Sequence, residues 1–365
     1  MDFDLRPKKL DVYIVKKFIT TFFVALLLII GIVIIFDISE KIDDFVSKEA
    51  PLRAVIFDYY VNFVPYFMNM FSPLFVFITV IFFTSKMAAD SEIIGILSCG
   101  ISFHRMMRPY VFSAALIAAF SLCLNLFIIP DANKTRLDFE TKYIKNRYKS
   151  VGRNVHYQLA PGEFVYAESF SKWNNTAYRF TLEKIEDNKL VSKISAETAV
   201  YDTTNHSWRL KKYFIREYNE DLTDRIRSGK QLDTVIDLSV KDFYMTEKTV
   251  ETLTYSELND LIDTQKMRGD ANVKFALIEK NTRFALPFSA FILTIMGVAL
   301  SSKKRRGGIG WNIGIGIALA FTYILFLRFS QMFVHAGALP PVIALWLPNL
   351  VFAIIAGFLY RIAPK

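Results

Sequence analysis

The sequence predicts an α-helical membrane protein with six transmembrane helices and an extracytoplasmic all-β domain inserted between helices three and four. Hydrophobic residues form 53% of the chain and the mean hydropathy is +0.28, although 22% of the residues are charged. Apolar and charged residues must therefore be segregated, which excludes a disordered chain and a fully soluble enzyme. Six apolar runs approach the ~20 residues that cross a bilayer. A polar stretch at 131–283 separates the third run from the fourth.

The first three apolar runs occupy the N-terminal part of the chain. Phe18–Phe36 carries no charge, and its long apolar core lacks a small-residue cleavage site, which argues against a cleaved signal peptide. Tyr59–Ser85 is longer, and Pro65 and Pro73 predict breaks in it. Met106–Pro130 carries a single charge, near its start.

The last three apolar runs follow the polar stretch. They are Phe284–Ser302, Gly307–Leu327 and Val342–Tyr360. In the fifth run Gly310, Gly314 and Ala318 recur every four residues, so they form a smooth stripe that another helix can approach closely. Ordinary helix packing and a seam that opens and closes both fit this stripe. Asn62, Asn69 and Asn125, within or near earlier runs, are expected to face other helices or a cavity.

Lysine and arginine are concentrated in the short loops on one side of the predicted membrane. With a cytoplasmic N-terminus, that side carries fourteen of them, whereas the opposite loops, 37–58 and 328–341, carry four. The fourteen are Arg6, Lys8, Lys9, Lys16, Lys17, Lys86, Arg105, Arg108, Lys303, Lys304, Arg305, Arg306, Arg361 and Lys365. The positive-inside rule therefore predicts cytoplasmic termini. The run 303–306 is read as a topology anchor, with contact to a partner or to anionic lipid as the alternative.

Short segments rich in Val, Ile, Tyr, Phe and Thr predict antiparallel strands in the extracytoplasmic region. They are Asn154–Ala160, Glu163–Phe170, Ala177–Ile185, Leu190–Tyr201 and Ser207–Tyr218. Turn-forming pairs such as Pro161-Gly162 and Asp187-Asn188 separate them. This spacing is typical of a sandwich or an open jelly roll. Both cysteines, Cys99 and Cys123, lie outside the region, so the domain depends on its apolar core.

Helix is predicted to resume at Thr254, because Thr254 and Glu257 have the spacing of a capping box and Gly269 is a suitable stop. The predicted organisation is helices one to three in 1–130, the β-domain in 131–253, a helical connector in 254–283, and helices four to six in 284–365.

The loop between the second and third runs predicts a short helix over Ser91–Gly100. Asp90 or Ser91 can cap it, Glu92 suits its first turn, and Gly100 can end it. Its apolar face consists of Ile93, Ile94 and Leu97. One interpretation is an interfacial helix in which Glu92 only complements the helix dipole. The other is a coupling helix that docks in a groove of a cytoplasmic partner, where Glu92 meets a cation.

Common catalytic motifs are missing from the sequence. It contains no G-x-x-x-x-G-K-[ST] phosphate-binding loop, no G-x-S-x-G and no H-E-x-x-H. The four histidines are scattered at His104, His156, His206 and His335. We therefore expect no catalytic residue, no metal site and no cofactor on this chain. The net charge of +9 does not indicate nucleic acid, because most of the excess flanks the apolar runs.

Several short motifs accompany this order of parts. They are Leu10-Asp-x-Tyr-Ile-x-Lys16, the Ser91-Glu-Ile…Gly100-Ile-Ser loop, Arg283-x-Ala-x-Pro287 followed by Gly297, the basic turn with Gly307, and Pro340-Pro341. Together they resemble the lipopolysaccharide-export permeases LptF and LptG over essentially the whole chain. The start and the short C-terminal tail look closer to the LptG type.

The resemblance implies a non-catalytic inner-membrane subunit of an ABC-type exporter that extracts lipopolysaccharide and passes it to periplasmic bridge proteins. The implied partners are a paralogous permease in a heterodimer, a cytoplasmic ATPase dimer, and a single-span protein with a periplasmic jelly roll. ATPase coupling is thereby assigned to Ser91, Glu92, Ile93, Ile94, Leu97 and Gly100. A lateral gate between spans one and five is assigned to Ile30, Gly310, Gly314 and Ala318.

One position departs from the G-type pattern, which often carries a phosphate-contacting lysine near the end of span one. Asp37 stands at about that place. Lys41, Arg53 and Arg136 are therefore the candidate lipid-phosphate contacts. The alternative function is a membrane scaffold or sensor whose β-domain binds a ligand without transport. An ion-coupled transporter is a third class, but midplane carboxylates and inverted repeats are not evident.

Overall fold

The computed structural model describes residues 8–144, 152–171, 174–203, 205–218, 224–238, 240, 243, 247–270, 272–303 and 308–363. The predicted basic run lies outside these residues except for Lys303, as do Arg6, Gly307 and Lys365. The chain divides into two compact units. The membrane unit comprises Met1–Lys145, Glu251–Tyr255 and Leu277–Lys365, and the β unit comprises Asn146–Val250 and Ser256–Ala276.

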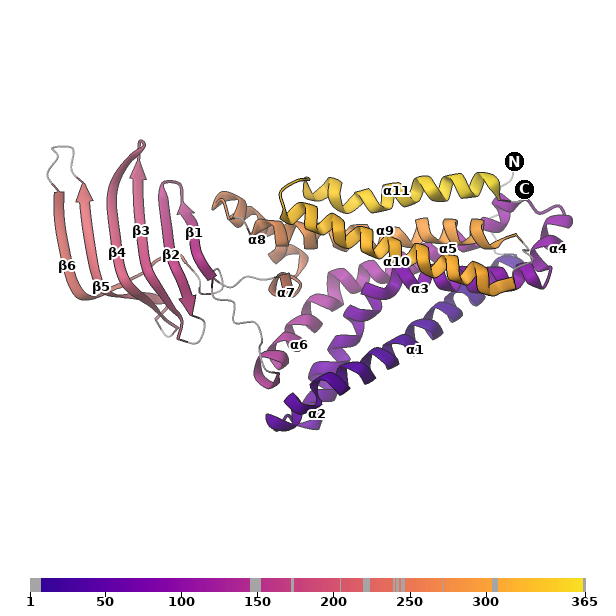
Figure 1. The fold of residues 1–365 in the computed structure, drawn as a ribbon, viewed down its shortest axis with the longest axis horizontal. Coiled ribbons are helices and arrows are strands. Elements are labelled where there is room, and N and C mark those ends of the chain that lie inside the picture. The colour runs from indigo at the N-terminus through magenta and orange to yellow at the C-terminus, as the bar shows by residue number, and fades with distance from the viewer. Residues whose placement is uncertain are drawn as a thin grey trace. The chain divides into compact units, whose positions relative to one another are not determined.

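Six helical segments in the described chain are long and apolar enough to cross a membrane (Figure 1). The first is α1 (Lys9–Ser47); the second joins α2 (Leu52–Ala54), the π-helical turn η1 (Val55–Tyr60) and α3 (Val61–Ala89); the third joins α5 (Phe103–Cys123), η2 (Leu124–Ile128) and α6 (Ile129–Tyr143). The remaining three are α9 (Val273–Ser301), α10 (Gly308–His335) and α11 (Pro341–Ile362). The short α4 (Glu92–Ser98) follows the second segment. The predicted fold class, six membrane helices with a β-domain after the third, is confirmed.

Helix α1 is far longer than its apolar core. Its 39 residues span about 58 Å at 1.5 Å per residue, nearly twice the ~30 Å hydrocarbon thickness of a bilayer. Both polar ends therefore extend beyond the membrane. Five of its six buried residues recur every four positions and form one line along the helix: Ile14, Phe18, Phe22, Leu26 and Ile30. The sixth is Phe45, near the end of the helix.

The second and third segments continue through their prolines. Helix α3 is unbroken across Pro65 and Pro73, so the predicted breaks are wrong; buried transmembrane helices tolerate proline because neighbouring groups satisfy the freed carbonyls. Pro130 lies in the first turn of α6, where its missing N–H costs little. Residues 131–143, placed in the β-domain by the sequence analysis, continue the third helix.

Helix α3 packs against α1, α5, α6 and α10, and two glycines allow especially close approach to it. A Cβ added at Gly297 of α9 would lie 3.0 Å from Val80 Cγ1. A Cβ added at Gly316 of α10 would lie 2.4 Å from Ile81 Cδ1. Small residues at these crossings therefore set the spacing of the bundle.

Buried polar side chains link the helices at two levels. Asn69 Nδ2 donates to Asn125 Oδ1 at 2.8 Å, and Ser121 Oγ donates to Asn69 Oδ1 at 2.5 Å. Tyr323 donates its hydroxyl to Asn349 Oδ1 at 2.9 Å. The expectation is confirmed for Asn69 and Asn125, whereas Asn62 donates to the carbonyls of Phe57 and Asp58 in its own helical segment. Such bonds average about 0.6 kcal/mol each in a membrane protein, so they add specificity to packing.

The β unit contains a six-stranded antiparallel sheet whose strands follow one another in sequence order (Figure 1). The strands are β1 (Gly152–Ala160), β2 (Glu163–Ser171), β3 (Thr176–Glu186), β4 (Lys189–Asp202), β5 (Ser207–Tyr218) and β6 (Asp224–Thr234). The sequence analysis missed β6, because this edge strand is mostly polar and exposed and lacks the apolar alternation of the others. The pair Asp187 and Asn188 turns with positive φ at both residues, as a tight hairpin requires.

One face of the sheet carries the core of the β unit. Trp208 is fully buried and donates its indole N–H to the Leu238 carbonyl at 3.0 Å, which ties the chain after β6 to that face. Two further helices complete the described connector, α7 (Glu247–Val250) and α8 (Tyr255–Met267). Helix α8 begins directly after Thr254, and Gly269 follows it with φ +63°, as predicted.

We predict that Gly316→Leu lowers the free energy of unfolding by about 1–3 kcal/mol, the usual cost of overpacking, because the new side chain must displace the fully buried Ile81. Gly314→Leu is the matched control, since nothing lies within 4 Å of its Cβ position. Thermal unfolding in detergent compares the two variants. Equal losses would contradict the close approach at residue 316.

Candidate functional site

The short helix α4 starts at a sharp turn. Ser91 adopts φ 61° and its side chain makes no capping hydrogen bond, while Asp90 closes α3, so the predicted side-chain cap is not formed. The left-handed residue redirects the chain instead. Gly100 has φ +79°, and its N–H donates to the Leu97 carbonyl at 3.0 Å. The predicted end of the helix at Gly100 is confirmed.

The apolar residues of α4 divide between two directions. Ile93 is 1% exposed and belongs to the same buried cluster as Ile14 and Phe18 of α1. Leu97 packs partly against that cluster. Ile94 is 52% exposed. The predicted single apolar face is therefore split, and Ile94 is the member that this chain leaves uncovered.

Glu92 is held by α1. The Tyr13 hydroxyl donates to Glu92 Oε2 at 3.1 Å, and Lys17 Nζ lies 3.9 Å from Glu92 Oε1. Lys17 also donates to the Tyr13 hydroxyl at 2.7 Å. The carboxylate thus has a cation of its own chain beside it. The sequence analysis did not connect these residues, because nothing local relates Glu92 to positions 79 residues earlier.

A second ion pair joins the first turns of α1 and α5. Arg105 donates from Nη1 to Asp11 Oδ1 and from Nη2 to Asp11 Oδ2, each at 2.6 Å. This two-bond geometry is the strongest arrangement of an arginine with a carboxylate. At the same end of the bundle, His104 Nδ1 lies 3.2 Å from the Tyr360 hydroxyl of α11. The start of α1, the α4 loop and the end of α11 therefore share one end of the bundle.

At the opposite end, aromatic side chains from α1, η1, α3 and α6 form a cluster, called here the aromatic cluster. Its buried members are Phe45, Tyr59, Tyr60, Phe63 and Phe139. Both tyrosines belong to the π-helical turn η1. Short π-helical turns inside helices are frequent at functional sites. No sequence pattern predicted this turn.

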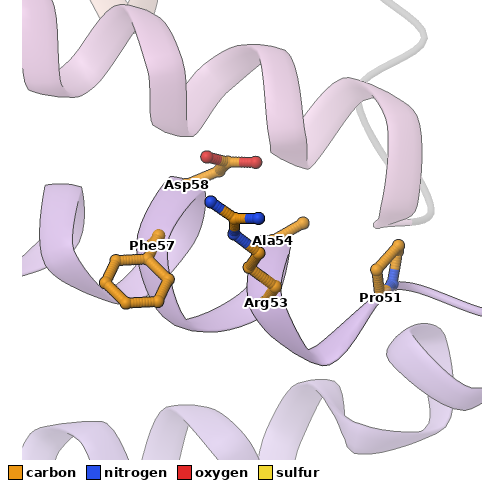
Figure 2. Close-up of a pocket in the computed structure, with 5 residues that line it drawn as sticks. All are labelled: Pro51, Arg53, Ala54, Phe57 and Asp58. Atoms are coloured by element: carbon orange, nitrogen blue, oxygen red, sulfur yellow. The ribbon is translucent and has the colours of Figure 1, made fainter.

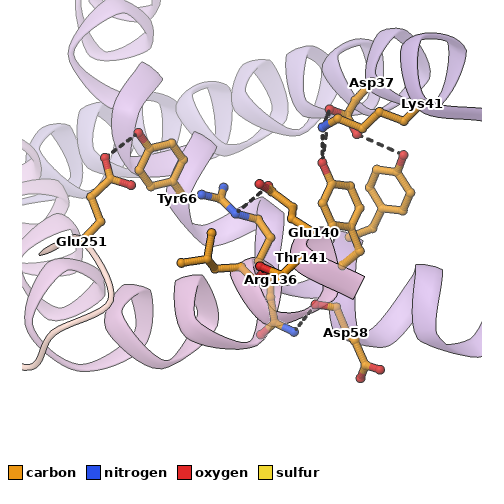
Figure 3. A network of polar contacts seen from close by, with 12 residues as sticks. Asp37, Lys41, Asp58, Tyr66, Arg136, Glu140, Thr141 and Glu251 are labelled. Atoms are coloured by element: carbon orange, nitrogen blue, oxygen red, sulfur yellow. Dashed lines mark hydrogen bonds and ion pairs between the residues drawn. The ribbon is translucent and has the colours of Figure 1, made fainter. Parts of the chain in front are cut away.

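Lys41 contacts this aromatic cluster. Its ammonium lies 2.5 Å from Asp37 Oδ1 and donates to the Tyr59 hydroxyl, while Tyr60 donates to Asp37 Oδ2 at 3.1 Å (Figure 3). The side chains of Lys41 and Asp37 are 21% and 12% exposed. Asp37, which stands where a lysine was expected, therefore pairs with Lys41, the nearest cation. The predicted phosphate contact by Lys41 would require this cluster to open.

Arg136 is also engaged inside the bundle. The residue is 8% exposed, its Nε lies 3.6 Å from Glu140 Oε1, and its guanidinium carbon lies 4.8 Å from the centre of the Tyr66 ring. Figure 3 shows Arg136 between Tyr66 and Glu140, and the Tyr66 hydroxyl donates to Glu251 at 3.3 Å. The guanidinium therefore faces protein groups on both sides.

Arg53 is placed differently from the other two candidate cations. It is exposed and lines an open pocket of about 420 Å³ with Pro51, Ala54, Phe57 and Asp58 (Figure 2). In that view the guanidinium and the Asp58 carboxylate point toward each other. Of the three predicted phosphate contacts, Arg53 is the one that a headgroup can reach without rearrangement.

The predicted gate residues do not share one environment. Ile30 is 3% exposed and faces the core of the bundle. Gly310, Gly314 and Ala318 are exposed, and nothing lies within 4 Å of a Cβ built on either glycine. Among the described residues, therefore, no helix packs on the stripe. In an apolar 18-residue stretch of each spanning helix, only 22% of the α1 residues and 28% of the α10 residues are buried, against 67% for α9.

These features define the class of the protein: a polytopic membrane protein with a loop helix at one end of its bundle and a β-domain inserted after the third helix. The profile of the lipopolysaccharide export system permease LptF/LptG matches residues 12–362, and the chain belongs to this family. The profile covers both subunit types without separating them. A comparison with curated protein sequences gave no match.

We predict that Lys41→Met costs about 1–3 kcal/mol of stability, because it leaves the Asp37 carboxylate in a partly buried site without its cation. Asp37→Asn combined with Lys41→Met should restore most of the loss. Lys48→Met is the control, since the Lys48 ammonium donates to the Ile144 carbonyl rather than to a carboxylate. Thermal unfolding of these three variants and the unaltered protein shows whether the loss and its recovery occur. Unchanged stability of Lys41→Met together with weaker lipid binding would instead assign Lys41 to phosphate.

Proposed function

We propose that this chain is the transmembrane permease subunit of an ATP-driven exporter that extracts lipopolysaccharide from the inner membrane, with ATP hydrolysed on a separate cytoplasmic ATPase dimer. Membership of the LptF/LptG family over residues 12–362 carries the proposal. The physical demand is large, because exposing acyl chains to water costs about 0.8 kcal/mol per CH₂. The bare apolar faces of α1 and α10 provide a wall along which such chains stay out of water.

The complex that we infer contains this chain, a paralogous permease, the ATPase dimer and a single-span protein with a periplasmic jelly roll. The β unit would pass the glycolipid to that jelly roll and so to the periplasmic bridge. The N-terminal motif favours the LptG type. These assignments rest on the family and on the motifs of this sequence.

Both termini and the α4 loop are proposed to be cytoplasmic, with the β unit periplasmic. The excess of cations in the loops at that end supports this orientation. The contacts of Glu92 with Tyr13 and of His104 with Tyr360 support a shared side for both termini and the loop.

Cysteine labelling in intact cells tests the orientation. In a background that replaces the exposed Cys99 and Cys123 by serine, Asn188→Cys in the β3–β4 turn should react with a membrane-impermeant maleimide. Lys303→Cys, which is also exposed, should react only after the cells are opened. The reverse pattern would overturn the orientation and the direction of transport.

Helix α4 is proposed to dock on the ATPase through Ile94. Ile93 anchors the helix in its own chain, Leu97 packs beside it, and Gly100 ends it, so Ile94 is the exposed apolar residue aimed away from the bundle. An exposed apolar side chain on a loop helix suits a groove on a partner, because apolar anchors dominate interface energies.

Ile94→Asp should therefore weaken association with the ATPase by at least about tenfold, since losing an interface anchor typically costs about 2 kcal/mol or more. Ile226→Asp is the matched control, because Ile226 is 56% exposed on β6 and lies in the β unit. Co-purification with the tagged ATPase, at equal amounts of membrane-inserted chain, gives the comparison. Normal yield of the Ile94→Asp complex would contradict docking through α4.

The lateral gate is proposed at α1 and α10, facing helices outside this chain. The exposed stripe of Gly310, Gly314 and Ala318 supports this placement on α10. On α1 the exposed Leu28 suits the role better than the buried Ile30. Arg53 is the proposed headgroup contact, because its guanidinium is exposed beside a pocket.

A further inference from the structure

The first two turns of α1 contact both ends of the loop that contains α4. At the first residue of α4, Glu92 accepts a hydrogen bond from the Tyr13 hydroxyl at 3.1 Å and has Lys17 Nζ 3.9 Å away. After it, Arg105 in the first turn of α5 makes two hydrogen bonds of 2.6 Å to Asp11. Between these contacts, Ile93 is buried in the cluster that contains Ile14 and Phe18 of α1. Polar and apolar contacts thus join α4 to the same two turns of α1.

The rest of α1 is comparatively free. Only 22% of its apolar 18-residue stretch is buried, the smallest share among the six membrane segments of the described chain. An α-helix is stiff along its axis, so a displacement imposed on its first turns moves the exposed middle as well. The connection at the base is therefore placed where a small movement of α4 can shift α1.

The surface of α4 that is proposed to dock on the ATPase and the contacts between α4 and α1 use different residues. Ile94 is exposed and faces away from the cluster, whereas Glu92 is directed to Tyr13 and Lys17. Exposed hydrogen bonds and ion pairs contribute little to stability, so removing these two partners of Glu92 should leave the fold intact. A partner can then bind α4 while the connection to α1 is altered separately.

We propose that Tyr13 and Lys17 are positioning residues that transmit movement of α4 to α1, so that nucleotide-driven displacement of the loop helix shifts the wall helix of the lipid cavity. This inference rests on the proposed function and adds the path by which the ATPase acts on α1. Glu92 in this scheme links α4 to α1 within the permease.

The test uses the whole complex, purified with this chain and reconstituted in proteoliposomes containing lipopolysaccharide. Tyr13→Phe and Lys17→Met should lower the lipopolysaccharide removed per ATP hydrolysed by about threefold or more, within the range by which residues along a coupling path act. Complex yield should stay normal. Tyr360→Phe is the matched control, because its hydroxyl contacts His104 of α5 and neither α1 nor α4. The charge exchange Lys17→Glu with Glu92→Lys should recover transport that either single change reduces.

An unchanged ratio of lipid to ATP in Tyr13→Phe and Lys17→Met would overturn the inference. A loss of complex yield in step with the loss of transport would also overturn it, because the contact would then serve assembly alone. Failure of the charge exchange to recover transport would oppose a direct link between the two residues. The proposed function fails separately, if the unaltered complex removes no lipopolysaccharide or Ile94→Asp still binds the ATPase.

Discussion

The close approach of α9 and α10 to α3 is the constraint on which the membrane unit depends. Lipid tails are as apolar as leucine, so helices in a bilayer gain little from hiding apolar surface and must gain from contact. Gly297 and Gly316 supply that contact, because each leaves room for a side chain of α3 where a Cβ would collide. The buried amides of Asn69 and Asn125 then fix which helices pair. With α3 and α9 committed to the interior, α1 and α10 are left at the periphery with much of their apolar surface bare.

Helix α1 is held by polar contacts at its two ends, and between them it buries one line of side chains and leaves the rest of its surface bare. One end is joined to α4 and α5 through Glu92 and Arg105. The other end is joined to the aromatic cluster through the Asp37–Lys41 pair. The two attachments differ in kind. The Glu92 contacts of the first attachment are partly exposed and belong to a short loop helix, whereas its Asp11–Arg105 pair and the Asp37–Lys41 pair of the second attachment are largely buried.

Charge near a membrane is expensive unless it is paired, and this determines which cations remain for a lipid headgroup. Lys41 and Arg136 look available in the sequence, yet Asp37 and Glu140 of the same helices neutralise them. Each pair has the i, i+4 spacing that places both side chains on one helix face. Arg53 precedes the π-helical turn and stays exposed. The chemistry of headgroup recognition therefore depends on pairing within the chain as much as on the number of cations.

The sequence by itself determined the six spans, five of the six strands, the loop helix ending at Gly100 and the family, because these depend on local apolar runs, turn residues and motifs in chain order. Tertiary structure decided the rest. Glu92 and Tyr13 meet across 79 positions, and Gly316 rather than Gly314 takes the close crossing of α10 with α3. Ile93 is buried while its neighbour Ile94 is exposed. These outcomes depend on which helix lies against which face, and a single chain's periodicity gives the faces of a helix without naming the neighbour that covers each one.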